Sequence, residues 1–240
     1  MKKTKLFCCP HAGGSAFSYS KWKNYFNPHI EVVPIELAGR GYRIEESLYQ
    51  SMEEAVNDVY NSIVKKLDNS LYILYGHSMG SLIAYELARK IQDSNNVLPE
   101  FLVLSGRNHP NSKIKNIRHN LPDEQFKNEV IAMGGTSTEV LQSEELMGIF
   151  LPILRADFKI VETYIHNNNI RACDIDFLVL NGKNDELTTY DEVKKWKQYT
   201  SKSCTFNSFE GNHFFLNENI EEIASGIIRK LESKRFSTSF

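Results

Sequence analysis

Three residues of this chain, Ser78, Asp185 and His213, carry the side chains needed for nucleophilic catalysis, and each follows a segment predicted to be a buried strand. A serine hydroxyl is a poor nucleophile at neutral pH unless an imidazole accepts its proton, and a carboxylate must hold that imidazole in the correct tautomer. Because the carboxyl ends of parallel strands meet at one edge of a sheet, we expect the three side chains to lie close together. Their types and positions predict acyl transfer through a covalent serine intermediate.

The predicted nucleophile lies in the sequence Gly76-His77-Ser78-Met79-Gly80, which follows an apolar run from residue 71 to 75. This G-x-S-x-G spacing is that of a nucleophile elbow, in which a strand turns so sharply into a helix that a Cβ on either glycine would collide with neighbouring backbone. The pattern alone is weak, because glycine beside serine usually marks only a turn. The preceding strand and the glycine- and proline-free helical stretch 81–92 favour the nucleophile.

The base and the acid are selected by their positions along the chain. His213 follows the last predicted strand, whereas His77 adjoins the serine too closely to reach its Oγ and is expected to pack beside the elbow. His11 precedes a glycine-rich loop that is unsuited to a general base. Asp185 is the predicted acid because it lies in the loop after the next-to-last strand, and Glu186 is its nearest competitor.

Acyl chemistry also needs N–H groups that stabilise the oxyanion formed from the attacked carbonyl. One expected donor is the backbone N–H of Met79, directly after the nucleophile. The other should come from the glycine-rich loop 10–16, from Ala12 or else from Gly13. Taken alone, that loop would be interpreted as a tight strand-to-helix connection, since glycines serve turns more often than ligands.

The whole chain has the composition of an ordinary globular protein. Its 240 residues fit one α/β domain, and 41% hydrophobic residues, 24% charged residues and a formal net charge of −2 argue against a nucleic-acid binder or a disordered chain. No window is long enough to span a membrane, and the apolar run after the basic start is too short for export, so we expect a cytoplasmic protein. The cysteines lack metal-ligand spacing, so neither a metal site nor a disulfide framework is expected; they are Cys8, Cys9, Cys173 and Cys204.

Strands and helices alternate through the first hundred or so residues, which is typical of a parallel sheet covered on both faces. With the chain order Ser, Asp, His, this predicts an α/β-hydrolase fold, with a mostly parallel, doubly wound sheet in a single domain spanning residues 1–240. The expected strands are 6–9, 30–36, 71–75, 101–105, 176–181 and 204–209, and the main expected helices are 51–68, 81–92 and a closing helix around 220–231.

A long insertion, at about residues 107–160, separates two of these strands where one helix would normally suffice. It should contain a helix that starts near residue 121 and ends at Gly134-Gly135, then a long helix from about Ser143 that is broken or kinked at Pro152. Helices inserted at the ligand edge predict a lid over the serine. We expect the first half of the long helix, including Phe150, to shape the substrate pocket, and the part from Phe158 onward to be ordinary core.

Taken together, these stretches resemble a type II thioesterase, a stand-alone editing enzyme of nonribosomal peptide and polyketide synthesis. Two departures from that family's pattern, Ala38 in place of proline and Ser81 in place of alanine, should affect at most the local loop shape. The resemblance covers nearly the whole chain and is carried by residues 10–16, Gly39-Arg40-Gly41, 76–80, Gly134-Gly135-Thr136, 151–158, Glu162-Thr163-Tyr164, Gly182 with Asp185, and Gly211-Asn212-His213-Phe214-Phe215.

The resemblance implies a substrate, an acyl or aminoacyl thioester on the 4'-phosphopantetheine arm of an acyl or peptidyl carrier protein domain. No metal or soluble cofactor is implied, because the arm arrives attached to the carrier, and no nucleic acid or membrane partner is implied. The arm would pass between the lid and the loop around Gly13 and Gly14, so we expect substrate contacts from these two residues, His11 and Phe150.

Several alternatives stay open. The basic residues Arg107, Lys113, Lys115 and Arg118 could dock an acidic carrier domain, although a run of charge is more often a solvated surface. Another enzyme on the same scaffold, such as a medium-chain fatty-acyl thioesterase or an esterase, would use the same three residues. A non-catalytic binding module is disfavoured, because it has no physical need for an intact nucleophile, acid and base.

Overall fold

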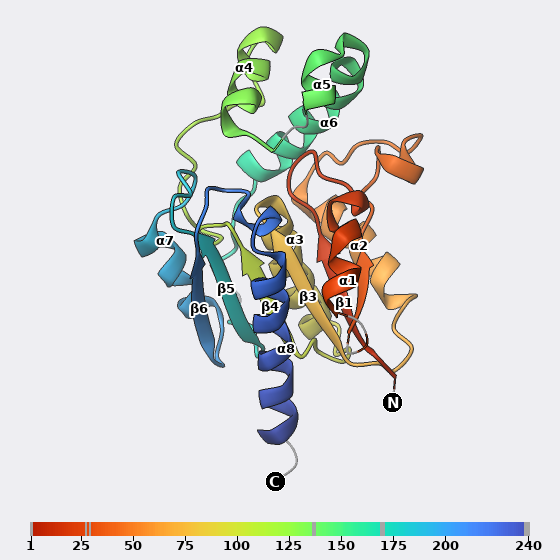
Figure 1. Cartoon of the computed structure of the whole chain (residues 1–240), viewed down its shortest axis with the longest axis vertical. Coiled ribbons are helices and arrows are strands. Elements are labelled where there is room, and N and C mark those ends of the chain that lie inside the picture. Colours follow the sequence, from red (N-terminus) through yellow and green to blue (C-terminus); the bar gives the residue numbers. More distant parts are fainter. Residues whose placement is uncertain (1, 27, 29, 136–137, 169–170, 238–240) are drawn as a thin grey trace.

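Six strands form one sheet in which every neighbouring pair runs parallel (Figure 1). The structure is a computed structural model that describes residues 2–26, 28, 30–135, 138–168 and 171–237. It confirms the predicted α/β class. The strand order is β2-β1-β3-β4-β5-β6, with bounds β1 Thr4–Cys9, β2 Ile30–Pro34, β3 Tyr72–His77, β4 Phe101–Ser105, β5 Asp176–Gly182 and β6 Cys204–Phe209.

The chain leaves the neighbouring strands β1 and β3 in opposite directions. After β1 it crosses to β2 on one side, and after β3 it proceeds through β4, β5 and β6 on the other. Strands β1 and β3 are direct neighbours, and their last paired residues are Cys9 and Gly76. Connections that diverge in this way leave a crevice at the carboxyl ends of the two strands, where open α/β sheets bind their ligands.

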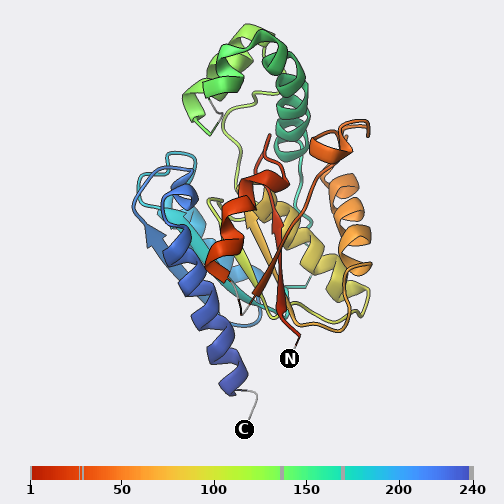
Figure 2. The ribbon, with the colours of Figure 1, turned by 45° about the vertical axis from the view of Figure 1, so that its right-hand side comes forward.

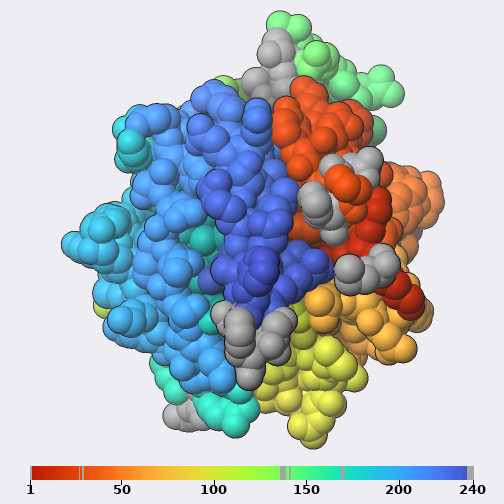
Figure 3. Space-filling model, turned by 60° about the horizontal axis from the view of Figure 1, so that its bottom comes forward, coloured from red at the N-terminus to blue at the C-terminus, as the bar shows by residue number. Residues whose placement is uncertain are grey.

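Helices cover both faces of the sheet because side chains alternate along each strand. Within β1, Phe7 and Cys9 join the core beneath α2 (Met52–Val64) and α3 (Met79–Asp93), while Leu6 and Cys8 join the core beneath α8 (Ile220–Ser237). Figure 3, which shows the end opposite the lid helices, places α8 in dark blue beside the red N-terminal segment.

No helix in the described part of the chain is long and apolar enough to cross a membrane. The remaining short elements are η1 Ala16–Trp22, α1 Lys23–Phe26, η2 Gly41–Arg43, α7 Tyr190–Lys194, η3 Lys195–Tyr199 and η4 Phe215–Asn217.

The segment between β4 and β5 rises above the carboxyl edge of the sheet as three helices (Figures 1 and 2). They are α4 (Asp123–Met133), α5 (Thr138–Gln142) and α6 (Glu144–Glu162), and α4 is capped at Gly134, as the sequence predicted. Their position over the strand ends is that of a lid. Thr136 lies outside the described residues.

The lid has its own small core and is fastened at its base. Phe126 and Val130 of α4 pack against Leu154 of α6 in a cluster separate from the two cores of the sheet. At the base, Arg155 Nη1 donates to the carbonyl oxygens of His119 and Leu121, at 2.6 and 2.8 Å. These bonds tie the segment that enters the lid to the helix that leaves it.

Helix α6 runs unbroken through Pro152, so of the predicted break or kink the break is wrong. Proline lacks the N–H that would bond the carbonyl four residues earlier, which here belongs to Gly148. Gly148 is exposed, so water can satisfy its carbonyl, and no side chain of Gly148 crowds the proline ring. The second half of α6 is only partly core of the sheet: Ile160 joins it, as expected, whereas Phe158 packs on Phe126 of the lid.

Candidate active site

Ser78 lies at the corner between β3 and α3 with φ +53° and ψ −112°, a backbone conformation that non-glycine residues rarely adopt. Such strain costs about 1–3 kcal/mol and persists only where surrounding contacts enforce it. A Cβ on Gly76 would lie 1.9 Å from the carbonyl oxygen of Gly80, and a Cβ on Gly80 would lie 2.1 Å from that of Cys9. Both glycines are therefore required by close backbone approach, as the sequence predicted.

The elbow is braced from below by Ser81, which had been expected to affect only local loop shape. Its buried hydroxyl lies 2.8 Å from the carbonyl oxygen of Gly76 and 2.9 Å from that of Ser105, and it accepts from the Ser105 N–H at 3.0 Å. The N–H of Ser78 donates to the Ser105 carbonyl as well, at 2.8 Å. Ser81 thus joins β3, β4 and α3 directly beneath the strained corner.

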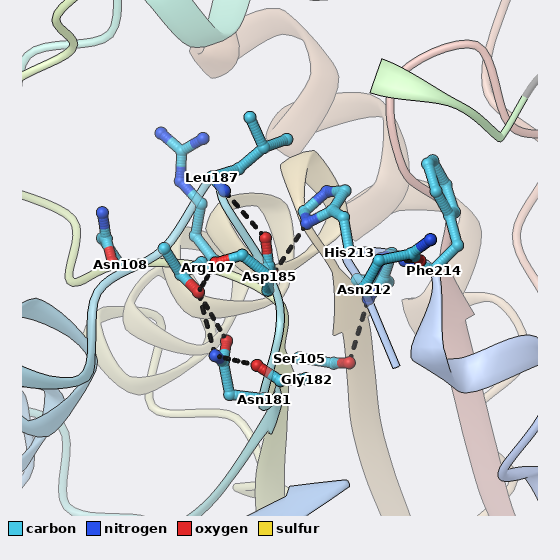
Figure 4. Close-up of polar contacts among 12 residues, drawn as sticks. Ser105, Arg107, Asn108, Asn181, Gly182, Asp185, Leu187, Asn212, His213 and Phe214 are labelled. Carbon is cyan, nitrogen blue, oxygen red and sulfur yellow. Dashed lines mark hydrogen bonds and ion pairs between the residues drawn. The ribbon is translucent and has the colours of Figure 1, made fainter. Parts of the chain in front are cut away.

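The predicted base and acid meet at the same edge of the sheet. His213 Nδ1 and Asp185 Oδ2 are 2.9 Å apart, and the Asp185 side chain is fully buried (Figure 4). The other carboxylate oxygen, Oδ1, accepts from the Leu187 N–H at 2.9 Å, so the acid is held on both sides. No hydrogen bond joins Ser78 to His213 among the described residues; before substrate binds, such catalytic contacts are often loose.

His77 packs beside the elbow, as predicted. Its ring is fully buried, with Nδ1 2.9 Å from Ser105 Oγ, and its centroid is 5.0 Å from that of His213. Burial lowers the pKa of His77 well below its ordinary value, and His213 and His11 lower it further. Desolvation, helped by His213 and Arg40, also lowers the pKa of His11 to about 4. Both rings stay neutral at neutral pH, so neither places a positive charge beside the base.

The depressed pKa of His77 makes a prediction about stability and pH. Unfolded His77 binds a proton as the pH falls below about 6.5 while the folded form does not, so the free energy of unfolding should decrease on acidification, by at most about 1.4 kcal/mol per pH unit per such group. In His77→Gln the decrease between about pH 7 and pH 5 should be smaller. Urea unfolding of both proteins at the two pH values measures it, and equal slopes would contradict it.

The loop after β1 is held in one conformation. The Gly14 N–H donates to the His11 carbonyl at 2.9 Å, and Gly13 has φ +74°, which together describe a tight turn of type II form with Ala12 and Gly13 at its centre. The Gly13 N–H donates to Asp157 Oδ2 at 2.8 Å. Gly13 is therefore unavailable as the oxyanion donor, which leaves Ala12 of the two predicted candidates. The N–H groups of Ala12 and Met79 make no hydrogen bond within the described residues.

Asp157, on lid helix α6, also forms a bidentate ion pair with Arg40. Arg40 Nη1 lies 2.6 Å from Asp157 Oδ2, and Arg40 Nη2 lies 2.8 Å from Oδ1. The two side chains are only 4% and 2% exposed. Arg40 Nη1 also donates to the carbonyl of Gly14 at 3.2 Å. One buried ion pair thus connects the loop after β1, the loop after β2 and the lid.

Besides the Asp157 contacts, apolar side chains pack between the lid and the active-site loops at two points of the described structure. A Cβ on Gly13 would lie 2.7 Å from Leu154 Cδ2 and 2.9 Å from Phe150 Cζ, so these two α6 side chains pack directly on the turn. At the other point, a Cβ on Gly135 would lie 2.1 Å from the ring of Phe214, the residue after His213. Phe150 and Leu154 therefore lie against the Gly13 side of the predicted path between the lid and the turn.

The four basic residues considered for docking do not form one surface patch. Lys113 and Lys115 are exposed. Arg107 lies beside Leu187 near the Asp185 loop in Figure 4, where burial lowers its pKa to about 10. Arg118 is paired with Glu129, with Nε and Oε2 2.8 Å apart. Only the two lysines present free-standing positive charge toward solvent.

Like that of Ser81, the roles of Arg40 and Asp157 near the site were not predicted from the sequence. Both lay in stretches that carried the family resemblance, but they are 117 residues apart and no spacing rule links them. One signal was available: Asp157 is a carboxylate on the otherwise apolar side of α6, between Leu154 and Ile160. A buried carboxylate needs a cationic partner, so an aspartate at that position favours a buried arginine or lysine nearby.

Known protein families and solved structures match nearly the whole chain. The sequence model of the thioesterase domain family matches residues 4–231. The chain is 38% identical over 230 residues to the gramicidin S biosynthesis protein GrsT of Aneurinibacillus migulanus, an alignment that covers 95% of this chain and 89% of GrsT.

Solved structures agree as well. ClbQ from the colibactin NRPS/PKS pathway matches with a TM-score of 0.93 and 33% identity, over 98% of this chain and 100% of ClbQ. The type II thioesterase BorB from the borrelidin biosynthetic cluster matches with a TM-score of 0.86 and 30% identity, over 96% and 93%. The chain therefore belongs to the thioesterase domain family, as a type II thioesterase that hydrolyses thioesters.

Proposed function

We propose that this thioesterase is an editing enzyme that removes aberrant or stalled acyl and aminoacyl groups from the 4'-phosphopantetheine arm of carrier proteins in nonribosomal peptide or polyketide synthesis. The observation that carries the proposal is the buried Asp185–His213 pair at the same sheet edge as the strained Ser78 elbow. The naming of GrsT and ClbQ after biosynthetic pathways supports the choice of a carrier-bound substrate.

In the first half of the proposed reaction, Ser78 Oγ attacks the thioester carbonyl carbon while its proton passes to His213. The carbonyl oxygen becomes an oxyanion that accepts hydrogen bonds from the N–H groups of Met79 and Ala12. When the tetrahedral intermediate collapses, the C–S bond breaks and His213 returns the proton to the departing pantetheine sulfur. The acyl group is then esterified to Ser78, and the carrier leaves with a free thiol.

In the second half, His213 takes a proton from a water molecule, whose oxygen attacks the acyl-enzyme carbonyl. The same two N–H groups stabilise the second oxyanion, the ester bond breaks, and His213 protonates Ser78 Oγ. Asp185 stays ionised throughout and stabilises the imidazolium formed in each half. The proposed sequence uses only groups of this chain and water, so it requires no soluble cofactor. A cytoplasmic location is part of the proposal.

Carrier-bound substrates should be preferred over small ones. A carrier domain can contact the enzyme at places remote from the reacting carbonyl. The binding energy of these remote contacts can lower the free energy of the transition state and so raise kcat/KM. We expect kcat/KM for an acetyl-loaded carrier protein to exceed that for acetyl-coenzyme A by at least about tenfold, which corresponds to about 1.4 kcal/mol. Steady-state hydrolysis of the two thioesters, together with an acetyl oxygen ester, measures the preference.

The same assay separates the rival functions when the acyl length is varied. A medium-chain fatty-acyl thioesterase would show a steep rise in kcat/KM toward longer chains whatever the carrier. An esterase would hydrolyse the oxygen ester at least as fast as the thioesters, and a binding module would release nothing. Each of these three results would overturn the editing proposal. A broad acyl tolerance with a carrier preference would support it.

A further inference from the structure

We propose that Arg40 and Asp157 are positioning residues for the oxyanion hole: through the N–H of Gly13 they lock the turn that presents the N–H of Ala12 to the reacting carbonyl. This inference rests on the proposed function, because it assumes that Ser78 attacks a thioester carbonyl. Neither side chain touches the reacting atoms in this arrangement. Their effect would pass through the backbone of residues 11–14.

The turn at residues 11–14 has the type II conformation, and Asp157 and Arg40 hold it there. Type I and type II turns differ by a flip of the middle peptide, which here joins Ala12 to Gly13. Asp157 Oδ2 accepts the N–H of that peptide at 2.8 Å, and Arg40 Nη1 donates to the Gly14 carbonyl at 3.2 Å. These bonds hold the type II form, in which Gly13 has φ +74°. Without these two bonds, residues 11–14 would no longer be held in place, and the direction of the Ala12 N–H, one peptide away from the Gly13 N–H, would no longer be fixed.

The opposite charges of Arg40 and Asp157 compensate each other beside the oxyanion loop. A carboxylate placed alone so close to the oxyanion loop would oppose the negative charge that forms there, and a lone buried guanidinium would be strongly destabilising. As a bonded pair, 2.6 and 2.8 Å apart and almost fully buried, the two charges largely cancel. The carboxylate can therefore accept the Gly13 N–H without adding net charge to the site.

The direction of the Ala12 N–H should affect kcat rather than KM. The oxyanion exists only in the transition state and the tetrahedral intermediates, so the direction of the Ala12 N–H affects them far more than substrate binding. Disturbing the turn should therefore lower kcat and leave KM nearly unchanged. Misplacement of a catalytic group by about 1 Å can cost about 10²-fold in rate.

The two partners of the ion pair also belong to different parts of the fold. Arg40 follows β2 and Asp157 lies on α6, three residues after Leu154, which packs on Gly13. The lid helix therefore does more than cover the serine: its lower half supplies the acceptor that fixes an oxyanion donor.

A pair of double variants tests the inference without leaving a buried charge unpaired. Arg40→Met with Asp157→Asn keeps an amide oxygen that can accept the Gly13 N–H, whereas Arg40→Met with Asp157→Leu keeps a similar shape without an acceptor. We expect kcat for acetyl-loaded carrier hydrolysis to be about 10-fold to 100-fold lower in the leucine variant than in the asparagine variant, with KM values within about twofold. Thermal unfolding of both establishes that they fold.

Asp58→Asn is the matched control. Asp58 also forms a bidentate ion pair with an arginine, Arg43, with Nη1–Oδ2 and Nη2–Oδ1 distances of 2.7 and 3.0 Å. It does not contact the Gly13 turn. We expect this variant to lose stability while kcat stays within about twofold of wild type, which separates the loss of an ion pair from the loss of the turn.

Equal kcat values in the two double variants, or a difference confined to KM, would overturn the inference. A failure of the proposed function is distinguishable, because the wild type would then be inactive or Ser78→Ala would be active. If the leucine variant does not fold, amide hydrogen exchange of the wild type replaces it. The Gly13 N–H should exchange slowly and the Ala12 N–H quickly, and equal exchange rates would overturn the inference.

Discussion

Replacing Ser78 with alanine should lower kcat for hydrolysis of an acyl-loaded carrier by about 10⁶-fold, because alanine has no oxygen to carry the acyl group. The fold should be unaffected. Alanine and serine both carry a Cβ, so the strain at φ +53° is the same for each, and no hydrogen bond of the Ser78 side chain is lost among the described residues. Full activity in this variant would show that another residue is the nucleophile.

The measurement should follow the covalent intermediate as well as the rate. Acid quenching of the wild type during turnover, followed by mass spectrometry, should find the acyl group on the peptide that contains Ser78. The alanine variant should carry no acyl group. Ser94→Ala is a suitable control, since Ser94 lies exposed at the opposite end of α3 and should leave kcat within about twofold.

Asp185→Asn should lower kcat by about 10⁴-fold while preserving the geometry, and the hydrogen bonds give the reason. The Leu187 N–H donates to Oδ1, so an asparagine here would place its carbonyl oxygen at Oδ1 and its NH₂ group toward His213. His213 Nδ1 would then have to accept a hydrogen bond, which puts the imidazole proton on Nε2. In that tautomer the ring cannot take the proton of Ser78.

Glu186→Gln is the control for this experiment, because Glu186 is the adjacent carboxylate and is exposed to solvent. It should leave kcat within about twofold. A large loss in Glu186→Gln with little loss in Asp185→Asn would reassign the acid. The kcat values of both variants, measured with the same acyl-loaded carrier, decide between the two carboxylates.

The strands and the candidate residues at their ends were predictable because each depends on local sequence. An apolar run followed by glycine, serine or aspartate indicates a strand and a loop wherever it lies in the fold, and the order of such units determines which loops share an edge. All six expected strands are present, with ends displaced by only a few residues. β3, for example, continues through Gly76 and His77, since the elbow turns only at Ser78.

What the sequence did not predict depends on contacts between distant segments or with solvent. The brace made by Ser81 needs the carbonyl of Ser105 on the neighbouring strand, and the Arg40–Asp157 pair joins two loops and a lid helix. The contact of Asp157 with the Gly13 N–H, which favours Ala12 over Gly13 as the second oxyanion donor, could not be read from any local pattern. The continuity of α6 at Pro152 depended on whether Gly148 faces water.

The fastening at the base of the lid has a consequence for recombination between related enzymes. Arg155 bonds the carbonyls of His119 and Leu121, and Glu162 accepts the N–H groups of Arg118 and His119, so the stretch from about 118 to 162 closes on itself. Because both of its ends are joined to each other, this stretch could be exchanged as one unit between related thioesterases. Asp157 lies inside this stretch, whereas Arg40 lies outside it. A stretch transferred from a related enzyme would therefore need a carboxylate at the position of Asp157, because Arg40 of the recipient would otherwise be buried without a counter-charge.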